Sequence, residues 1–439
     1  MQDILFEYEL NPTTWAYLAA LLTIGIYFKF NRLFSLRNLD LLGLIFFSPG
    51  LLMVFHGLDR GMHGVVHFGY AWLFGVGLFF LVRLLLDPLM VRRPMLEPNL
   101  SAGGLSFTGI AILVFLGANV VSNQPPERLE HVLARDQCWG LQSPGHAWFY
   151  YVSSFPSLRS GGEQAPKADW EYPPPYAQVA IARTVALLAQ LAVVLGIVAI
   201  GFYHFDNLQT GVAAAVLYLL IPYVGQMGGR IDHAVPAALL VWAMAAYRRP
   251  MVLGFLLGLA GGLVFYPLFL VPLGCSYYWR RGLTRYVLGT LLAVVLLVVL
   301  LAAVSGSLDK FREHLQQMFG LTILSRDNVV GFWEAYQPAY RIPVLTIFAV
   351  LAASLALWPA QKNFGTVLSC SATVMLAAQF CRAFEGGLYM AWYLPLLLLT
   401  SFRPNLEDRV ASSAVIERRA AWLVRLNERL RKSAAGMPL

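Results

Sequence analysis

One stretch of the chain, from Tyr286 to Val304, reads YVLGTLLAVVLLVVLLAAV and carries no charged side chain. As a helix rising about 1.5 Å per residue, such a run crosses the roughly 30 Å of hydrocarbon in a bilayer. Similar runs recur along the 439 residues, of which 58% are hydrophobic and only 13% charged. A water-soluble fold could not cover so much apolar surface with so few polar side chains. The chain is therefore predicted to be an integral membrane protein.

The lengths of the apolar runs predict an all-α, polytopic transmembrane helix bundle of about 11–13 membrane segments. Strands with alternating faces are absent from the sequence, which argues against a barrel. Two short runs meet at Gly261-Gly262 and Pro267, where we expect a kinked or re-entrant hairpin. The predicted segments cover residues 13–30, 39–56, 67–87, 103–121, 177–203, 209–226, 234–247, 251–264, 266–279, 286–304, 343–359, 366–381 and 387–402.

Basic residues cluster in the connections at one end of this predicted bundle, for example at Arg92-Arg93 and Arg248-Arg249. Because positive residues concentrate on the cytoplasmic side of a membrane, we expect a cell (inner) membrane protein with its N-terminus outside and its C-terminus in the cytoplasm. The tail repeats leucines among arginines at helical spacing, which is typical of an amphipathic helix on an anionic leaflet. The predicted parts are a three-helix membrane segment at 1–102, a membrane core at 103–402 and the basic tail at 403–439.

Charge and cysteine content exclude some classes of protein. The net charge of +8 comes from short basic clusters between apolar runs, which is a topology signal, so we expect membrane lipids and no nucleic acid as partners. The four cysteines show no paired metal-type spacing and indicate neither a zinc site nor a disulfide framework. No soluble cofactor is expected, and a divalent metal is possible but unsupported.

A long polar loop interrupts the apolar pattern between residues 122 and 176, on the predicted outer side. Asp136 follows an arginine and precedes Trp139, so its carboxylate could stay ionised and accept a proton from an attacking hydroxyl. Asp169 and Glu171 are alternative catalytic bases, closer to the point where the chain re-enters the membrane. Solvated charges within an ordinary aromatic belt are the competing interpretation for each carboxylate.

A second outer group lies in the short connection from Gln226 to His233. Arg230 offers a planar, permanently charged fork for phosphate, while Asp232 and His233 can orient that fork or move protons. With Gln226 they form a predicted substrate-binding corner. The alternative is that these charges only end a helix at the membrane interface.

Two further outer groups carry weaker signals. His63 and His67 are spaced i,i+4 and, with Asp59, could ligate a divalent metal if the segment is helical; polar caps on two helix ends explain the same pattern. The segment 305–342 carries Arg312 and Arg341 among other charges that could meet an anionic substrate.

Several short motifs occur in order between Asp169 and Trp279, and one more lies in the last apolar segment. They are Glu171-Tyr-Pro-Pro174, Gly225-Gln226, Arg248-Arg249, Gly254-Phe-Leu-Leu-Gly258 leading to Phe265-Tyr-Pro-Leu268, and Ala391-Trp-Tyr-Leu-Pro395. In this order the chain resembles the GT-C superfamily of polytopic glycosyltransferases, particularly the bacterial branch that uses polyprenyl-phosphate-mannose. It departs from that pattern at Asn119 and Asn123, where an acidic residue is usual, and at Val264-Phe265, where a lysine is usual.

The resemblance implies a GT-C-like core with a large extracytoplasmic loop, and a mannosyltransferase of the cell envelope. Such an enzyme moves a sugar from a polyprenyl-phosphate carrier to a lipid or glycan acceptor, with inversion at the anomeric carbon. Asp136, or else Asp169 or Glu171, would be the base, and Trp170 and Tyr172 would stack against the sugar or line the donor entrance. The alternatives are a multi-pass transporter or lipid flippase, in which ionisable residues line a path between helices, and a noncatalytic membrane scaffold.

Overall fold

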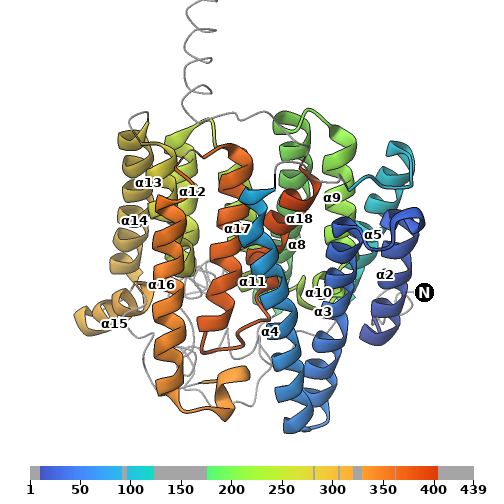
Figure 1. The fold of residues 1–439 in the computed structure, drawn as a ribbon. Helices are drawn as coiled ribbons and strands as arrows, with labels where there is room; N and C mark the ends of the chain where they lie inside the picture. Colours follow the sequence, from blue (N-terminus) through green and yellow to red (C-terminus); the bar gives the residue numbers. More distant parts are fainter. Residues whose placement is uncertain are drawn as a thin grey trace, which may run out of the picture.

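The computed structural model describes residues 10–90, 96–122, 176–279, 282–304, 307–319, 329–360 and 362–403. Within these residues the chain is a bundle of roughly parallel and antiparallel helices, and the one β-bridge joins Val330 to Phe384 (Figure 1). Asp136, Asp169, Trp170, Glu171 and Tyr172 lie outside the described residues, as does nearly all of the predicted tail at 403–439.

The helices follow the apolar runs closely. Their bounds are α2 Pro12–Tyr27, α3 Leu36–Asp59, α4 His63–Leu86, α5 Ala102–Ser122, α8 Tyr176–His204, α9 Leu208–Leu220, α10 Pro222–Met227, α11 Ile231–Ala245, α12 Pro250–Leu263, α13 Val271–Tyr277, α14 Leu283–Val304, α15 Leu308–Met318, α16 Arg341–Leu357, α17 Phe364–Cys381 and α18 Leu394–Phe402. The 3-10 turns are η1 Phe30–Arg32, η2 Asp87–Leu89, η5 Tyr266–Leu270, η6 Phe332–Ala335, η7 Pro338–Tyr340 and η8 Met390–Trp392.

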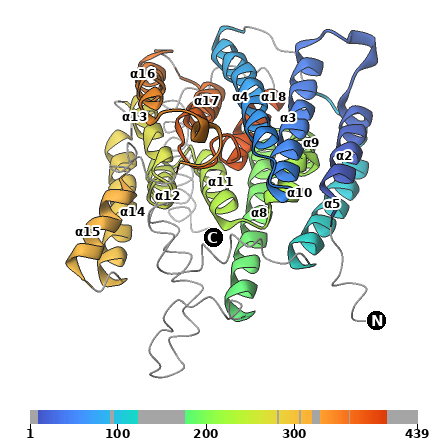
Figure 2. The same cartoon turned by 90° about the horizontal axis from the view of Figure 1, so that it is seen from below.

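Seven of the described helical stretches are long and apolar enough to cross a membrane, and α9, α11 and α12 are shorter apolar helices. The polytopic helical bundle is therefore confirmed, whereas the predicted total of 11–13 segments stays a prediction. The helix α17 lies in the middle of the bundle (Figure 2) and is almost wholly buried. The peripheral helix α14 exposes several leucines and valines. Exposed apolar side chains on peripheral helices are what a lipid environment permits.

Local sequence signals set several helix starts. The side chains of Asn11, Asn207 and Asn363 each accept backbone N–H groups in the first turn of α2, α9 and α17. These N-caps satisfy donors that the helix itself leaves unpaired.

Glycines bring α12 and α14 into close contact. A Cβ atom on Gly254 would lie 2.2 Å from the carbonyl oxygen of Tyr286, and one on Gly289 would lie 2.1 Å from the carbonyl oxygen of Met251. Small residues are typical where membrane helices approach closely. The Gly254-to-Gly258 motif thus has a packing role in this fold.

Prolines and glycines interrupt three of the predicted segments. The run 209–226 is wrong as a single helix, because Pro222 disfavours the helical conformation at Ile221 and separates α9 from α10. The expected kink after α12 is confirmed: Val264 is extended, and the following turn η5 folds back so that Leu268 lies against Gly261.

The prediction of a helix over 387–402 is also wrong. Regular helix begins only at Leu394, one residue before Pro395, which is well suited to the first turn. Gly387 has a φ of +94°, a left-handed backbone that cannot continue a helix. Residues 382–393 instead form an irregular connection between α17 and α18.

Candidate functional site

Polar side chains gather where α10 ends, α11 begins and the irregular connection 382–393 returns to the bundle. Seen from below, this connection lies in the middle of the molecule, between α4 and α12 (Figure 2). Its members come from distant parts of the sequence, since Arg230 and Glu385 are 155 positions apart. We call this set, built from Arg230, Asp232, His233, Arg382, Glu385 and Tyr389, the arginine cluster.

Arg230 directly precedes α11, and its backbone is extended. Its Nε and Nη2 donate to the two carboxylate oxygens of Asp232 at 3.2 and 2.8 Å, and its Nη1 donates to Glu385 Oε2 at 3.1 Å. Burial lowers the pKa of Arg230, but the adjacent Asp232 carboxylate together with Tyr389 and Tyr223 outweighs burial, and the net pKa is raised. The guanidinium is thus fixed in place and permanently charged.

His233 is fully buried beneath this ion pair. Its Nδ1 shares a short hydrogen bond with the hydroxyl of Tyr223, and its Nε2 lies 3.6 Å from Asp232 Oδ2. Its ring stacks on Tyr389, with centroids 4.2 Å apart and planes 23° apart. These contacts hold Asp232 and Tyr389 in place around the arginine.

Arg382, at the end of α17, lies in an aromatic cage. Its Cζ is 3.6 Å from the ring centroid of Tyr389, 4.8 Å from that of Trp392 and 5.9 Å from that of Tyr266. Its Nε donates to the Phe384 carbonyl at 2.8 Å. Although Arg382 is only 8% exposed, no carboxylate of the described chain pairs with it. Cation–π contacts therefore replace the usual counter-ion.

Tyr389 joins the two arginines. A ring stacked on His233 at 4.2 Å leaves only its other face for Arg382, so the tyrosine lies between imidazole and guanidinium. Arg230 Cζ is 5.7 Å from the same ring, and its Nη2 donates to the Tyr389 hydroxyl at 3.5 Å. Burial raises the pKa of Tyr389, with Arg382 acting in the opposite direction. The phenol therefore stays protonated at neutral pH.

Glu385 has an unusual backbone. Its φ is +48°, in the left-handed region that non-glycine residues rarely adopt, and its side chain is 1% exposed. The neighbouring bridge, in which Val330 donates to Ala383 and Glu385 donates to Val330, holds this backbone. Strain retained by its surroundings is common at functional sites.

The long loop leaves the bundle beside this cluster. The last turn of α5 meets the connection before α11, because a Cβ on Gly229 would lie 3.5 Å from Val120 Cγ1. The residue before Val120 makes a further contact with this region. The side-chain amide of Asn119 donates to the Gly225 carbonyl at 3.1 Å and accepts the Leu10 N–H at 3.1 Å. The segment that carries the predicted bases thus starts next to Arg230.

The structure brings three of the predicted binding residues together, namely Arg230, Asp232 and His233. Gln226 lies one short turn earlier, and its amide atoms are buried without a hydrogen-bond partner in the described residues. Sequence reasoning missed Arg382, Glu385 and Tyr389. Two features of the sequence indicate a polar, non-helical connection here. The pair Gly386-Gly387 is a poor helix former, and two charged residues precede it.

The histidine pattern between α3 and α4 does not form a metal site. His67 stacks against Phe332 with centroids 5.7 Å apart, and His56 shares a hydrogen bond with Thr13. Over the described ranges, no three potential ligands are close enough to hold a metal ion. Arg341, predicted to meet substrate, is buried and donates to the Cys381 carbonyl at 3.3 Å.

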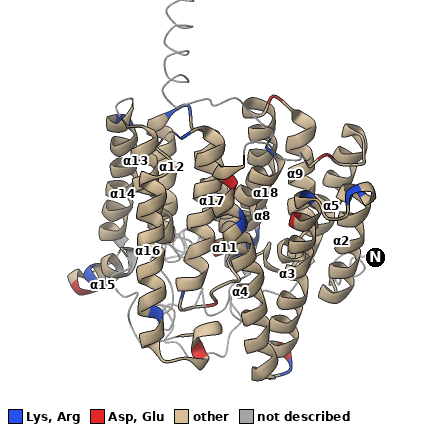
Figure 3. Ribbon diagram, in the orientation of Figure 1, with Lys and Arg blue, Asp and Glu red and all other residues tan. Residues whose placement is uncertain are grey.

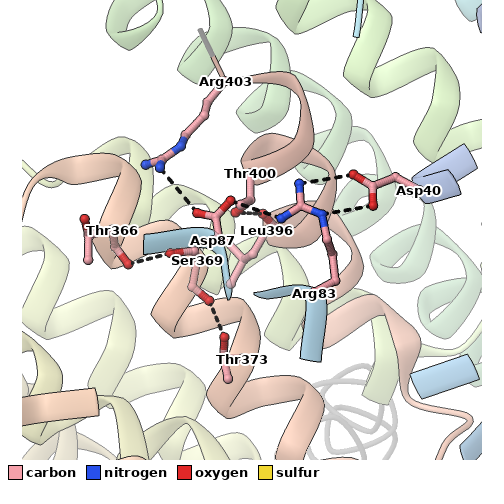
Figure 4. A network of polar contacts seen from close by, with 9 residues as sticks. All are labelled: Asp40, Arg83, Asp87, Thr366, Ser369, Thr373, Leu396, Thr400 and Arg403. Carbon is pink, nitrogen blue, oxygen red and sulfur yellow. Dashed lines mark hydrogen bonds and ion pairs between the residues drawn. The ribbon is translucent and has the colours of Figure 1, made fainter. Parts of the chain in front are cut away.

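A second ionic network lies at the other end of α4. Arg83 donates to both oxygens of Asp40 at 3.1 and 3.2 Å and to Asp87 at 3.4 Å, and Asp87 also accepts from Arg403 at 3.3 Å (Figure 4). This network ties α3, α4 and the end of α18 together.

Comparison with protein-family models, with curated proteins and with solved structures gave no match for this chain.

Proposed function

We propose that this protein is a membrane glycosyltransferase that moves a sugar, mannose or a similar hexose, from a polyprenyl-phosphate carrier to an acceptor outside the cytoplasm. The observation that carries the proposal is Arg382. A cation that is more than nine-tenths buried, held by aromatic rings and lacking a carboxylate partner in the described chain, is suited to receive an anion.

Arg230 complements Arg382. Its two carboxylate partners hold it in position, so a phosphate would meet a guanidinium that needs little reorganisation. Both arginines contact Tyr389, which places them on one site. The two positive charges of Arg230 and Arg382 balance the two negative charges of Asp232 and Glu385. The cluster is therefore neutral until a phosphate binds.

Lipid-linked donors also suit the surroundings. The cluster is part of an apolar helical bundle, so a prenyl chain can remain among helices while its phosphate reaches the arginines. The loop at 123–175 follows α5, whose last turn lies against Gly229. That loop supplies the carboxylates that we propose as bases.

The proposed reaction is a displacement. The acceptor hydroxyl oxygen attacks the anomeric carbon and forms the new glycosidic bond, while the bond from that carbon to the phosphate oxygen breaks. The leaving electron pair stays on the phosphate, where Arg382 and Arg230 stabilise the added charge. The acceptor proton passes to a loop carboxylate, Asp136 in first place and Asp169 or Glu171 as alternatives, and the sugar inverts.

The test is transfer of labelled sugar from polyprenyl-phosphate-mannose to a membrane extract by the purified protein in liposomes. Replacing Arg382 with Gln should lower the rate about a hundredfold, the usual cost of losing one stabilising group, and Arg382→Lys should lower it less. Arg60→Gln is the matched control. Arg60 is exposed and directly follows α3, so this variant should keep the parent rate. Transfer that survives Arg382→Gln would reject the assignment.

Transport remains the second candidate because Asp40, Arg83 and Asp87 are buried between helices. Buried ionisable groups in membrane segments often mark a path for ions or substrates. However, Asp40 is in the second turn of α3 and Arg83 in the last turn of α4, and both carboxylates are paired with Arg83. Solute flux in vesicles without sugar transfer would favour transport.

A further inference from the structure

The helix α15, residues Leu308–Met318, projects from the side of the bundle directly after α14 (Figure 1). Leu308, Phe311 and Leu315 are spaced at i, i+3 and i+7, so they share one face of the helix. Phe319 continues this face immediately after the helix ends. The sequence alone indicated an outer polar segment here and did not separate this helix from it.

Only part of the apolar face is buried by the bundle. Phe311 packs against a small cluster formed by Leu297 and Leu301 of α14. Leu308 is 85% exposed and Phe319 is 41% exposed. Large apolar side chains with that exposure, next to a membrane-spanning helix, need an apolar partner.

The position of α15 along the membrane normal follows from α14. That helix has 22 residues and so extends about 33 Å, close to the thickness of the hydrocarbon core. Its start lies at the basic end of the bundle, beside Arg285, so its end reaches the opposite membrane interface. Leu292, Leu296 and Val299 are exposed along it and lead directly to α15.

The polar side of α15 has the composition expected at such an interface. Asp309 is exposed on this side, and Arg312, four residues after Leu308, is exposed at its border with the apolar face; both signs of charge are visible on this helix in Figure 3. By contrast, α12 carries no charged residue along its length (Figure 3). An amphipathic helix of this kind lies in the interface plane, with its apolar face among acyl chains and its charges in water.

We infer that α15 is an interfacial helix that docks on the lipid bilayer at the end of α14 opposite Arg285. Leu308 and Phe319 insert between headgroups and acyl chains, continuing the lipid-facing surface of α14. Asp309 faces water, and Arg312, which lies at the border of the apolar face, extends its guanidinium to the headgroups. The partner is the bilayer itself, and the inference does not depend on the proposed sugar transfer.

Spin labels measure this arrangement directly. Single cysteines at positions 308, 319 and 309 (Leu308→Cys, Phe319→Cys, Asp309→Cys) would be introduced into the full chain after replacing its four cysteines with alanine. In liposomes, labels at 308 and 319 should collide more with oxygen than with a water-soluble nickel chelate, and the label at 309 should show the reverse. Leu292→Cys is the control for hydrocarbon depth.

A nickel preference at 308 and 319 would place the face in water and overturn the inference. Shielding from both reagents would mean that a protein surface covers it, which also overturns it. If the cysteine-free chain fails to fold, Leu308→Trp and Asp309→Trp in the parent chain provide the same comparison. Brominated lipids should then quench the added fluorescence at 308 and not at 309.

Discussion

At Tyr389 one aromatic ring serves three charged or titratable neighbours, with His233 on one face, Arg382 on the other and Arg230 near its hydroxyl. The tyrosine therefore sets the distance between two guanidinium groups that would otherwise repel each other. Glu385 completes the arrangement from a strained backbone. At the scale of single residues, the cluster is organised by aromatic packing as much as by ion pairs.

The strain at Glu385 leads to a comparison between two variants. Glu385→Ala and Glu385→Gly both remove the carboxylate from Arg230, and breaking such a buried pair should cost about 3 kcal/mol. Glycine adopts the left-handed φ freely, so Glu385→Gly should be more stable than Glu385→Ala by about 1 kcal/mol. Thermal unfolding in detergent measures the order, and equal stabilities would show that the backbone is not strained.

At the scale of elements, the closest helix pair is α12 with α14, where glycines replace side chains at the contact. Backbone carbonyl groups occupy the space that a Cβ would need, and backbone cannot move aside as a flexible side chain can. The two helices therefore pack as one unit, and α15 is attached to the far end of that unit. The kink at Val264 then returns the chain toward the arginine cluster through Tyr266.

Gly289→Ala should separate α12 from α14, since the new Cβ would lie 2.1 Å from the Met251 carbonyl oxygen. Overpacking of this kind typically costs about 1–3 kcal/mol. Gly75→Ala in α4 is the matched control, because nothing lies within 4 Å of its Cβ position. Alanine's higher helix propensity should leave that variant unchanged or slightly stabilised; unfolding temperatures of the two proteins decide the point.

At the scale of the whole molecule, two polar clusters lie at opposite ends of α17. The arginine cluster begins at Arg382, just after α17, and the ionic network surrounds Asp87, just after α4. The arginine cluster joins the start of α11 to the connection after α17, and the ionic network joins α3 and α4 to the end of α18, because Arg403 reaches Asp87. Ion pairs thus fix the mutual positions of helices whose apolar surfaces alone would permit sliding.

Asp87→Asn removes one carboxylate from both Arg83 and Arg403, and should lower the free energy of unfolding by about 3 kcal/mol. Arg403→Gln should cost less, because Arg403 is partly exposed. The double variant should be less destabilised than the sum of the two single variants, since each removes the same contact. Additive effects in chemical denaturation would show that the two groups do not interact.

Local sequence signals were enough to predict the helical membrane architecture and most helix bounds. Apolar run length, asparagine caps and proline positions are local properties. Their effect on helix formation does not depend on the tertiary contacts of the segment, as at Asn207 and Pro222. The sequence also indicated Arg230, Asp232 and His233 as a group, because they are adjacent in the chain. The same local reasoning failed over 387–402, where apolar content suggested a helix.

The surroundings of Arg230, Asp232 and His233 depend on how distant helices pack against them. Glu385 and Tyr389 reach Arg230 across more than 150 positions, and Asp40 reaches Arg83 from another helix. Which side chains meet depends on how helices pack in three dimensions, and no short-range pattern encodes that contact. The need to satisfy buried charges then bent the chain at Glu385 and Gly387 against its apolar tendency to form a helix.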